Sequence, residues 1–238
     1  MVKYLTGVLA LSLVMTGCGG SNSGSKKESE KMPNGVWLGS STSQLGVTDH
    51  GLLGLIAPNG ELRLFVSGGE HLSGNFKLNG DELSTVTTSF NAQGVLKDTA
   101  MAAGSYTSEK ISLEQTKGGE LLNTIELTYS ALSDNTAMFS RLMGTYASED
   151  QTTSLVFDDD GDITGSDTRG CVFNGSSSIP NDKINIYRIS LRVESCGALD
   201  GKYTGLAYWR AHATNEPEGI RFHLDDGSRA LSYFMNKV

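Results

Sequence analysis

Hydrophobic and polar residues alternate along much of the chain from Gly35 onward. The clearest runs are Glu61–Val66 and Gly219–Leu224, in which every second residue is apolar. In the second run, Arg221 and His223 occupy the polar positions. A period of two is typical of β-strands that bury one face. The pattern therefore predicts a body made of half-buried strands.

The run from Lys183 to Glu194 changes its parity. Ile184 and Ile186 share one parity, whereas the apolar residues from Ile189 to Val193 share the other. An extra residue in one strand of a pair produces such a change. We therefore expect a β-bulge near Tyr187.

Turn residues separate these runs. Asn-Gly or Asp-Gly pairs lie between apolar runs at Asn59-Gly60, Asn79-Gly80, Asp160-Gly161 and Asp226-Gly227. These pairs supply the positive φ values that tight hairpins need. The chain also holds 29 glycines and only 4 prolines, which suits short strands joined by tight turns. The sequence thus favours antiparallel hairpins.

The segment 133–143 interrupts the alternation. Met138, Phe139, Leu142 and Met143 have helical spacing there, so one or two helical turns are expected. The sequences on either side look alike at a separation of roughly 105 residues. For example, Gly104-Ser-Tyr-Thr in the first half corresponds to Gly201-Lys-Tyr-Thr in the second.

The resulting fold prediction is an all-β, antiparallel chain. Two tandem barrel-like or sandwich-like halves, at 35–132 and 144–238, are joined by a short helical turn at 133–143. Two barrels, two sandwiches, or one sheet system closed from both halves would each protect the strand edges. The alternation alone leaves these three arrangements open.

The N-terminal segment has the layout of a cleaved export signal, assigned to residues 1–17. Lys3 precedes a mostly apolar stretch from Tyr4 to Met15, which is shorter than the roughly 20 residues that a transmembrane helix needs. Residues 18–34 are small, polar and mixed in charge, as in a flexible tether. About 16 residues of such coil span roughly 20–24 Å.

Met15-Thr16-Gly17-Cys18 resembles the lipobox of bacterial lipoproteins, although Met15 stands where the family usually has Leu. The resemblance implies cleavage before Cys18, followed by a diacylglycerol and an N-acyl chain on that cysteine. Several acyl chains together anchor a protein stably. Gly19, in place of Asp, resembles the outer-membrane class. The predicted location is the outer membrane, with the periplasmic or surface side left open.

The charge balance excludes one class of partner. The formal net charge is −8, and removal of residues 1–17 takes away Lys3 and no acid, so it becomes −9. An acidic surface repels nucleic acids and anionic lipid headgroups. We therefore expect no nucleic-acid partner, and a membrane contact that comes only from lipid on Cys18.

Two cysteines remain once Cys18 is assigned to lipid. Cys171 and Cys196 would lie in an oxidising compartment, where an even remainder predicts a disulfide. The bond would close a loop of about 25 residues and contribute roughly 3 kcal/mol. Two reduced thiols are the alternative.

Motifs for catalysis or metal binding do not stand out. His50, His71, His212 and His223 form no known ligand spacing and are interpreted as exposed loop or strand-face residues. The acidic run Asp158–Asp162 could gather oxygens around Ca²⁺, but it fails the EF-hand spacing and is interpreted as a solvated hairpin tip. Trp37, Tyr203, Tyr208 and Trp209 are interpreted as core aromatics rather than pocket residues. We assign no catalytic, cofactor-binding or metal-binding residue.

Spaced glycines and aromatic residues recur through the mature chain. They are Gly35-x-Trp-x-Gly, Gly144-Thr-Tyr, Gly170-Cys171-x-Phe-x-Gly175, Asn185-x-Tyr187, Cys196 and Gly201-x-Tyr-x-Gly205. This set resembles a family of proteobacterial outer-membrane lipoproteins with a two-repeat β-rich body and no assigned activity. A more distant likeness is to paired-β-domain surface lipoproteins that capture host proteins.

These observations favour a membrane-anchored lipoprotein with a non-enzymatic binding or cell-envelope role. Two alternatives remain. One is a lipocalin-like carrier, in which a barrel lumen holds a small apolar ligand. The other is a hydrolase whose Ser, His and Asp come from distant strands and leave no local motif.

Overall fold

The computed structural model describes residues 31–213 and 216–238. The predicted export signal, Cys18 and the tether up to residue 30 lie outside the described residues. Within the described part, no helix combines the length and apolar character needed to span a membrane.

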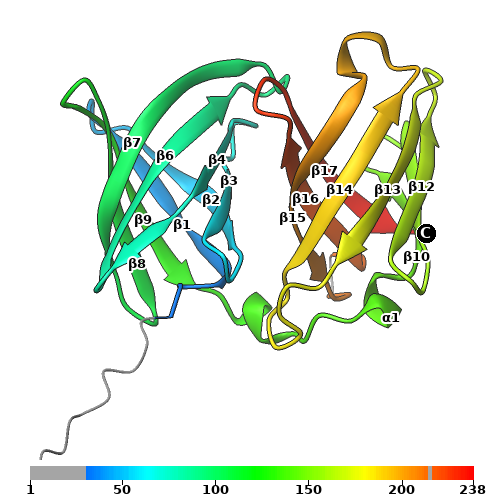
Figure 1. The fold of residues 1–238 in the computed structure, drawn as a ribbon, viewed down its shortest axis with the longest axis horizontal. Helices are drawn as coiled ribbons and strands as arrows, with labels where there is room; N and C mark the ends of the chain where they lie inside the picture. Colours follow the sequence, from blue (N-terminus) through cyan, green and yellow to red (C-terminus); the bar gives the residue numbers. More distant parts are fainter. Residues whose placement is uncertain (1–30, 214–215) are drawn as a thin grey trace, which may run out of the picture.

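The first half of the chain forms a closed antiparallel barrel (Figure 1). Its strands are β1 (Gly35–Ser43), β2 (Thr48–Ile56), β3 (Glu61–Phe65), β4 (His71–Asn75), β5 (Lys77–Asn79), β6 (Glu82–Phe90), β7 (Leu96–Tyr106), β8 (Lys110–Lys117) and β9 (Glu120–Tyr129). Strand β1 pairs with both β2 and β9, and pairing of β4 with β6 closes the ring. The short β5 continues alongside β6.

The second half forms another closed barrel, in which each strand pairs with the next and β10 pairs with β17. Its strands are β10 (Gly144–Ser148), β11 (Thr153–Phe157), β12 (Asp162–Asp167), β13 (Val172–Ser178), β14 (Tyr187–Glu194), β15 (Gly201–Arg210), β16 (Gly219–Asp225) and β17 (Ala230–Lys237). A 3₁₀ turn, η2 (Gly197–Leu199), precedes β15.

Two short helical turns, η1 (Ala131–Asp134) and α1 (Phe139–Leu142), connect the barrels at their lower ends in Figure 1. The predicted all-β architecture of two tandem antiparallel halves with a helical turn between them is confirmed. Each half closes on itself, so the barrel arrangement holds rather than a sandwich or a shared sheet.

The predicted turn glycines all adopt positive φ at hairpins. Gly60, Gly80, Gly161 and Gly227 have φ values of 86°, 70°, 87° and 85°. A side chain is strained in this region of φ, whereas glycine is not. The four Asn-Gly or Asp-Gly pairs thereby set the registers of the β2–β3, β5–β6, β11–β12 and β16–β17 hairpins.

The bulge expected near Tyr187 is absent from the described strand pairs, and that prediction is wrong. The pairing of β14 with β15 runs without a shift from Tyr187 to Val193. Ile184 and Ile186 precede the strand and pack against the first barrel, whereas Ile189 and the apolar residues after it fill the second barrel. The parity of the apolar residues changes because the first two lie in the interface between the barrels and the later ones lie in the interior of the second barrel.

The barrels pack side by side (Figure 1) through a mixed interface. Its apolar part contains Val36, Leu53, Leu55, Ala57 and Phe65 from the first barrel, and Ile184, Ile186, Leu206 and Tyr208 from the second. The nearly buried Arg63 crosses the interface to Asp225 at 3.2 Å, and Arg188 reaches Glu61 at 2.7 Å. Strand β3 and the second half of β2, from Leu52 to Ile56, are therefore buried on both faces.

Candidate ligand-binding site

The two ends of the first barrel differ. Trp37 closes the end at which β1 begins: it is 1% exposed, and its indole nitrogen donates to the Pro33 carbonyl at 3.1 Å. Its ring meets Tyr129 edge-on at 5.3 Å. Leucine and isoleucine side chains pack beside it, including Leu62, Ile111 and Leu127. This end is a filled core.

The opposite end of the same barrel holds a cavity of about 510 Å³. Buried apolar side chains form much of its wall, namely Leu52, Leu72, Ala100 and Ile125. Small residues explain the free volume, because β7 contributes Ala100 and β1 contributes Ser41 and Ser43 where larger side chains would fill the lumen. The result is an open, largely apolar pocket.

A chain of neutral hydrogen bonds crosses the cavity wall. The Asn123 side-chain amide donates to Gln115 Oε1 at 2.9 Å, and Gln115 Nε2 donates to Thr87 Oγ1 at 2.8 Å. The Thr87 hydroxyl then donates to the Ala100 carbonyl at 3.2 Å. Each amide nitrogen carries two hydrogens, so this chain leaves donors on Gln115 and Asn123 for a ligand. The cavity can thus orient a hydroxyl or carbonyl group.

Charged residues lie at the rim of the cavity. Lys97 pairs with Glu70, and the Asp98 carboxylate accepts from Lys117, each at 2.5 Å. That hydrogen bond from Lys117 lowers the pKa of Asp98, and a hydrogen bond from Ser67 lowers the pKa of Asp49. Asp49 and Asp98 therefore stay ionised at neutral pH.

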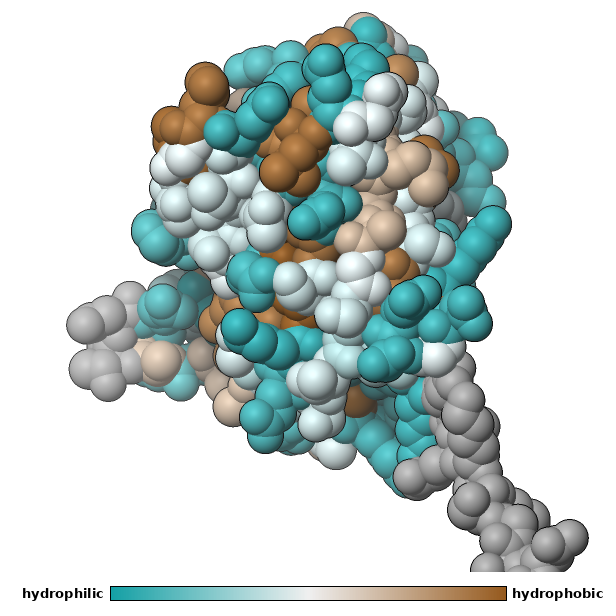
Figure 2. Space-filling view, turned by 90° about the vertical axis from the view of Figure 1, so that its left-hand side faces the viewer, coloured by the Kyte–Doolittle hydropathy of each residue, from teal (hydrophilic) through white to brown (hydrophobic). Residues whose placement is uncertain are grey.

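The β1–β2 hairpin adds exposed apolar residues beside the mouth. Leu45 is 90% exposed, and Val47, which also lines the cavity, is 69% exposed. Figure 2 shows the outer face of this barrel, where hydrophobic groups lie in separate patches among polar ones, in the upper part and across the middle. An apolar ligand entering the cavity would pass such a surface.

Large side chains fill the interior of the second barrel, and the cavity of about 630 Å³ beside Thr153, Arg169 and Tyr233 is an open hollow at one end of it. Tyr146, Phe157, Phe173, Tyr187, Tyr203 and Phe222 are all buried in its core. Tyr203 donates its hydroxyl to the Leu199 carbonyl at 3.0 Å. A buried tyrosine ring usually packs in the core while its hydroxyl group forms a hydrogen bond. Tyr203 and Trp37 are thus core residues, as expected from the sequence.

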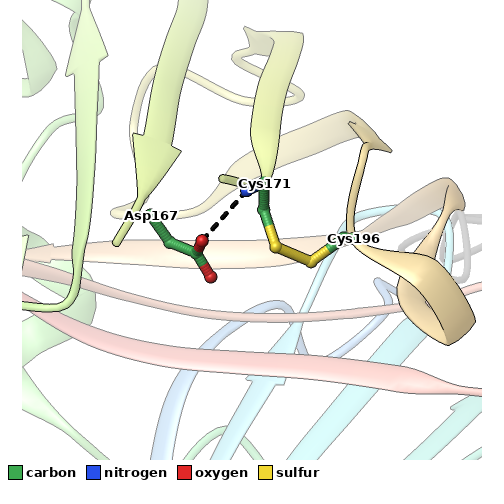
Figure 3. A group of neighbouring side chains, drawn as sticks. All are labelled: Asp167, Cys171 and Cys196. Atoms are coloured by element: carbon green, nitrogen blue, oxygen red, sulfur yellow. Dashed lines mark hydrogen bonds between the residues drawn. A yellow bond between two sulfur atoms is a disulfide. The ribbon is translucent and has the colours of Figure 1, made fainter. Parts of the chain in front are cut away.

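Cys171 and Cys196 form a disulfide, with a Cα–Cα distance of 4.6 Å (Figure 3). The Asp167 carboxylate accepts from the Cys171 backbone nitrogen at 3.0 Å. Among residues 31–213 and 216–238, these three residues bring possible metal-ligand atoms within 4.8 Å of one another. Both sulfur atoms are bonded to each other, and a zinc site needs free thiolates. We interpret the group as a structural cross-link.

The acidic run Asp158–Asp162 forms the tip of the β11–β12 hairpin. Asp158 Oδ1 accepts from the backbone nitrogens of Asp160 at 3.1 Å and Asp162 at 2.8 Å. One carboxylate therefore stabilises its own turn, as Asp side chains often do. This geometry favours the interpretation as a hairpin tip over a calcium site.

Two of the four histidines are not exposed, contrary to the expectation. His50 and His212 are exposed, but His71 is 7% exposed and His223 is fully buried between the barrels. Their ring centroids lie 4.7 Å apart. Burial lowers the pKa of His71 to about 4 and the pKa of His223 well below its usual value. These two histidines lie on strand faces that the sequence predicts to be exposed, and the packing of the barrels against each other buries them.

Tyr208 and Trp209 lie on opposite sides of β15. Tyr208 belongs to the interface between the barrels, whereas Trp209 packs at the edge of the second core. The Trp209 indole donates to Glu218 at 3.1 Å. The alternation predicted these opposite directions, although not the covering of Tyr208 by the first barrel.

Comparisons with known proteins give little beyond the fold. No family model matches the chain, and no curated protein matches it. Among solved structures the chain is similar to Aeromonas veronii immune modulator A, with a TM-score of 0.41 and 10% identity over 86% of this chain and 94% of that chain. A likeness at this level does not support a functional assignment.

Proposed function

We propose that this protein is a lipid-anchored outer-membrane lipoprotein that acts by binding, and that the open end of its first barrel takes a small, mostly apolar ligand. The contrast between the barrels carries the proposal: one lumen holds a cavity of about 510 Å³, while the other is packed with aromatic rings. This contrast favours the carrier alternative over envelope binding through an outer surface alone.

The size and lining of the cavity fit a small molecule. Ligand pockets typically enclose about 300–1,000 Å³, with apolar walls and a few polar groups that fix orientation. Leu52, Leu72 and Ile125 would supply the apolar contact. A ligand that removes roughly 200 Å² of apolar surface from water gains about 5 kcal/mol before the costs of association.

The charges and amides favour a neutral ligand over a fatty-acid anion. Three acids line the cavity, Asp49, Glu70 and Asp98, and the two bases at its rim, Lys97 and Lys117, are already paired with Glu70 and Asp98. A carboxylate at the rim would meet like charge. The neutral amides of Gln115 and Asn123 instead suit a hydroxyl, ester or amide group.

The position of the chain entry supports binding on the side away from the membrane. The Lys31 carbonyl accepts from Tyr106 at 2.9 Å, so the chain enters near the closed end of the first barrel. If lipid on Cys18 holds the protein, the cavity mouth lies at the opposite end of the barrel from the tether. The proposed lipid anchor itself rests on Met15-Thr16-Gly17-Cys18.

A neutral fluorophore whose emission rises in apolar surroundings, such as N-phenyl-1-naphthylamine, tests the binding site. The wild-type protein should bind it saturably. Ala100→Phe, which projects a ring into the cavity, should weaken binding at least about tenfold, equal to 1.4 kcal/mol. Ala103→Phe is the matched control, since Ala103 lies on the same strand and is exposed. Equal affinities in all three proteins would exclude the cavity as the site.

A further inference from the structure

A second cavity, of about 710 Å³, lies at the junction of the two barrels. Its lining includes Tyr208, Arg210, Arg221, Phe234 and Asn236, which come from the outer face of β15, β16 and β17. Leu132 of η1 borders the same groove. The groove is separate from the lumen of either barrel.

Arg221 is the unusual residue in this groove. Its guanidinium lies over the ring of Phe65 from the first barrel at 4.6 Å, and over Phe234 at 5.7 Å. Among residues 31–213 and 216–238 its side chain makes no hydrogen bond and has no acidic partner within 4.0 Å. Burial lowers its pKa, yet an arginine keeps its charge at neutral pH. The groove thus presents a half-buried cation whose N–H donors have no protein acceptor.

Arg210 brings a second cation to the same ring. Its guanidinium lies over Phe234 at 4.2 Å, and its outer nitrogens contact Glu216 at 2.9 Å and Asn236 at 3.2 Å. The charge of Arg210 repels that of Arg221 and lowers its pKa, by less than the charge of Glu149 raises it. Glu149 lines the groove and attracts Arg221, but it forms no ion pair with it. A bound anion would relieve this repulsion.

We propose that this groove binds an oxyanion, a carboxylate or a phosphate group, on the free edge of Arg221. The planar guanidinium fork matches both groups and forms short, charge-assisted hydrogen bonds. The stacking rings of Phe65 and Phe234 hold the fork in one orientation. Tyr208 and Phe234 give the groove an aromatic wall, which suits an anion attached to an apolar or aromatic body.

The site is distinct from the neutral cavity in the first barrel and does not depend on it. It needs both barrels, because Phe65 belongs to β3 and Phe234 to β17. On a chain with a formal charge of −8, a cation without an acidic partner is a specific feature rather than part of a general basic surface.

The competing explanation is that Arg221 only clamps Phe65 against Phe234. Two substitutions separate these roles. Arg221→Met keeps the apolar stem between the rings but removes the charge. Arg221→Lys keeps the charge but removes the planar fork. A clamp would change stability alone, whereas an anion site would change affinity in folded protein.

The test is calorimetric titration of the protein with inorganic phosphate and with benzoate at constant ionic strength, with sodium chloride as the reference. Saturable binding of either anion is expected. Arg221→Met should weaken it at least about tenfold, and Arg221→Lys by a smaller factor, where tenfold corresponds to 1.4 kcal/mol. Arg192→Gln is the control, because Arg192 is exposed and pairs with Glu194 at 3.6 Å. It should bind like the wild type.

Binding of phosphate alone would assign a phosphate-bearing ligand, and binding of benzoate alone a carboxylate. Folding of each variant is checked by circular dichroism, and Arg221→Lys decides the outcome if Arg221→Met does not fold. The proposal is overturned if neither anion binds saturably, or if a folded Arg221 variant binds as tightly as the wild type.

Discussion

Acid should weaken the contact between the barrels through His71. The residue is 7% exposed, and its ring lies close to those of Phe65 and His223. Its pKa falls from 6.5 to about 4 because burial disfavours the charged form. Between these two values the unfolded chain binds a proton at His71 and the folded protein does not. Stability therefore falls as the pH drops from about 6.5 to about 4, and the loss levels off below that range.

The magnitude follows from the same two values. From pH 7.5 to pH 5, the depressed pKa of His71 corresponds to a loss of about 2 kcal/mol in the free energy of unfolding. His223 acts in the same direction, because burial and the charges of His71 and Arg63 lower its pKa. Asp225 acts oppositely near pH 4, since burial raises its pKa and favours proton uptake by the folded state.

Urea denaturation at pH 7.5 and at pH 5, followed by circular dichroism, measures this effect. His71→Leu removes the titrating group and should reduce the stability lost between the two pH values by up to about 2 kcal/mol. His50→Gln is the matched control, because His50 is exposed and should leave the profile unchanged. If folded His71→Leu lost as much stability as the wild type, His71 would not be the acid-sensitive group.

Two further predictions concern the cysteines. Cys171→Ser with Cys196→Ser should lower the free energy of unfolding by roughly 3 kcal/mol, because a disulfide with a sequence separation of 25 is lost; an unchanged urea midpoint would contradict this. Cys18→Ser should abolish membrane retention or processing when cell fractions are compared by immunoblot, and membrane-bound, normally processed protein would refute the lipid anchor.

Much of the fold could be predicted because its signals are local. Alternation marks strands, Asn-Gly and Asp-Gly mark hairpins, and the helical spacing at 133–143 marks the connection. Closure into barrels could not be predicted, because it depends on pairings between distant residues, such as His71 with Phe90 and Tyr146 with Lys237. Sandwiches would have used the same local pattern.

The candidate sites escaped prediction for a related reason. Alternation shows which residues point into a barrel, but not which end of the lumen their side chains fill. The open end depends on residues from separate strands, such as Ala100 and Gln115. The burial of His223 could not be predicted either, because it results from the packing of one barrel against the other. One signal was available: the run from Leu52 to Ile56 is apolar at adjacent positions, which is typical of a strand buried on both faces.

The strands that form the cavity wall also form the interface between the barrels. On β4, Leu72 lines the cavity, while the adjacent His71 lies between the barrels. On β3 and just beyond it, Phe65 packs against the second barrel and Val66 faces the cavity. A ligand that shifts these strands when it binds must therefore also change the surroundings of His71. Because linkage is reciprocal, ligand binding and His71 protonation should shift each other. The pKa of His71, followed by NMR with and without bound ligand, measures that coupling, and an unchanged value would show that the cavity and the interface act independently.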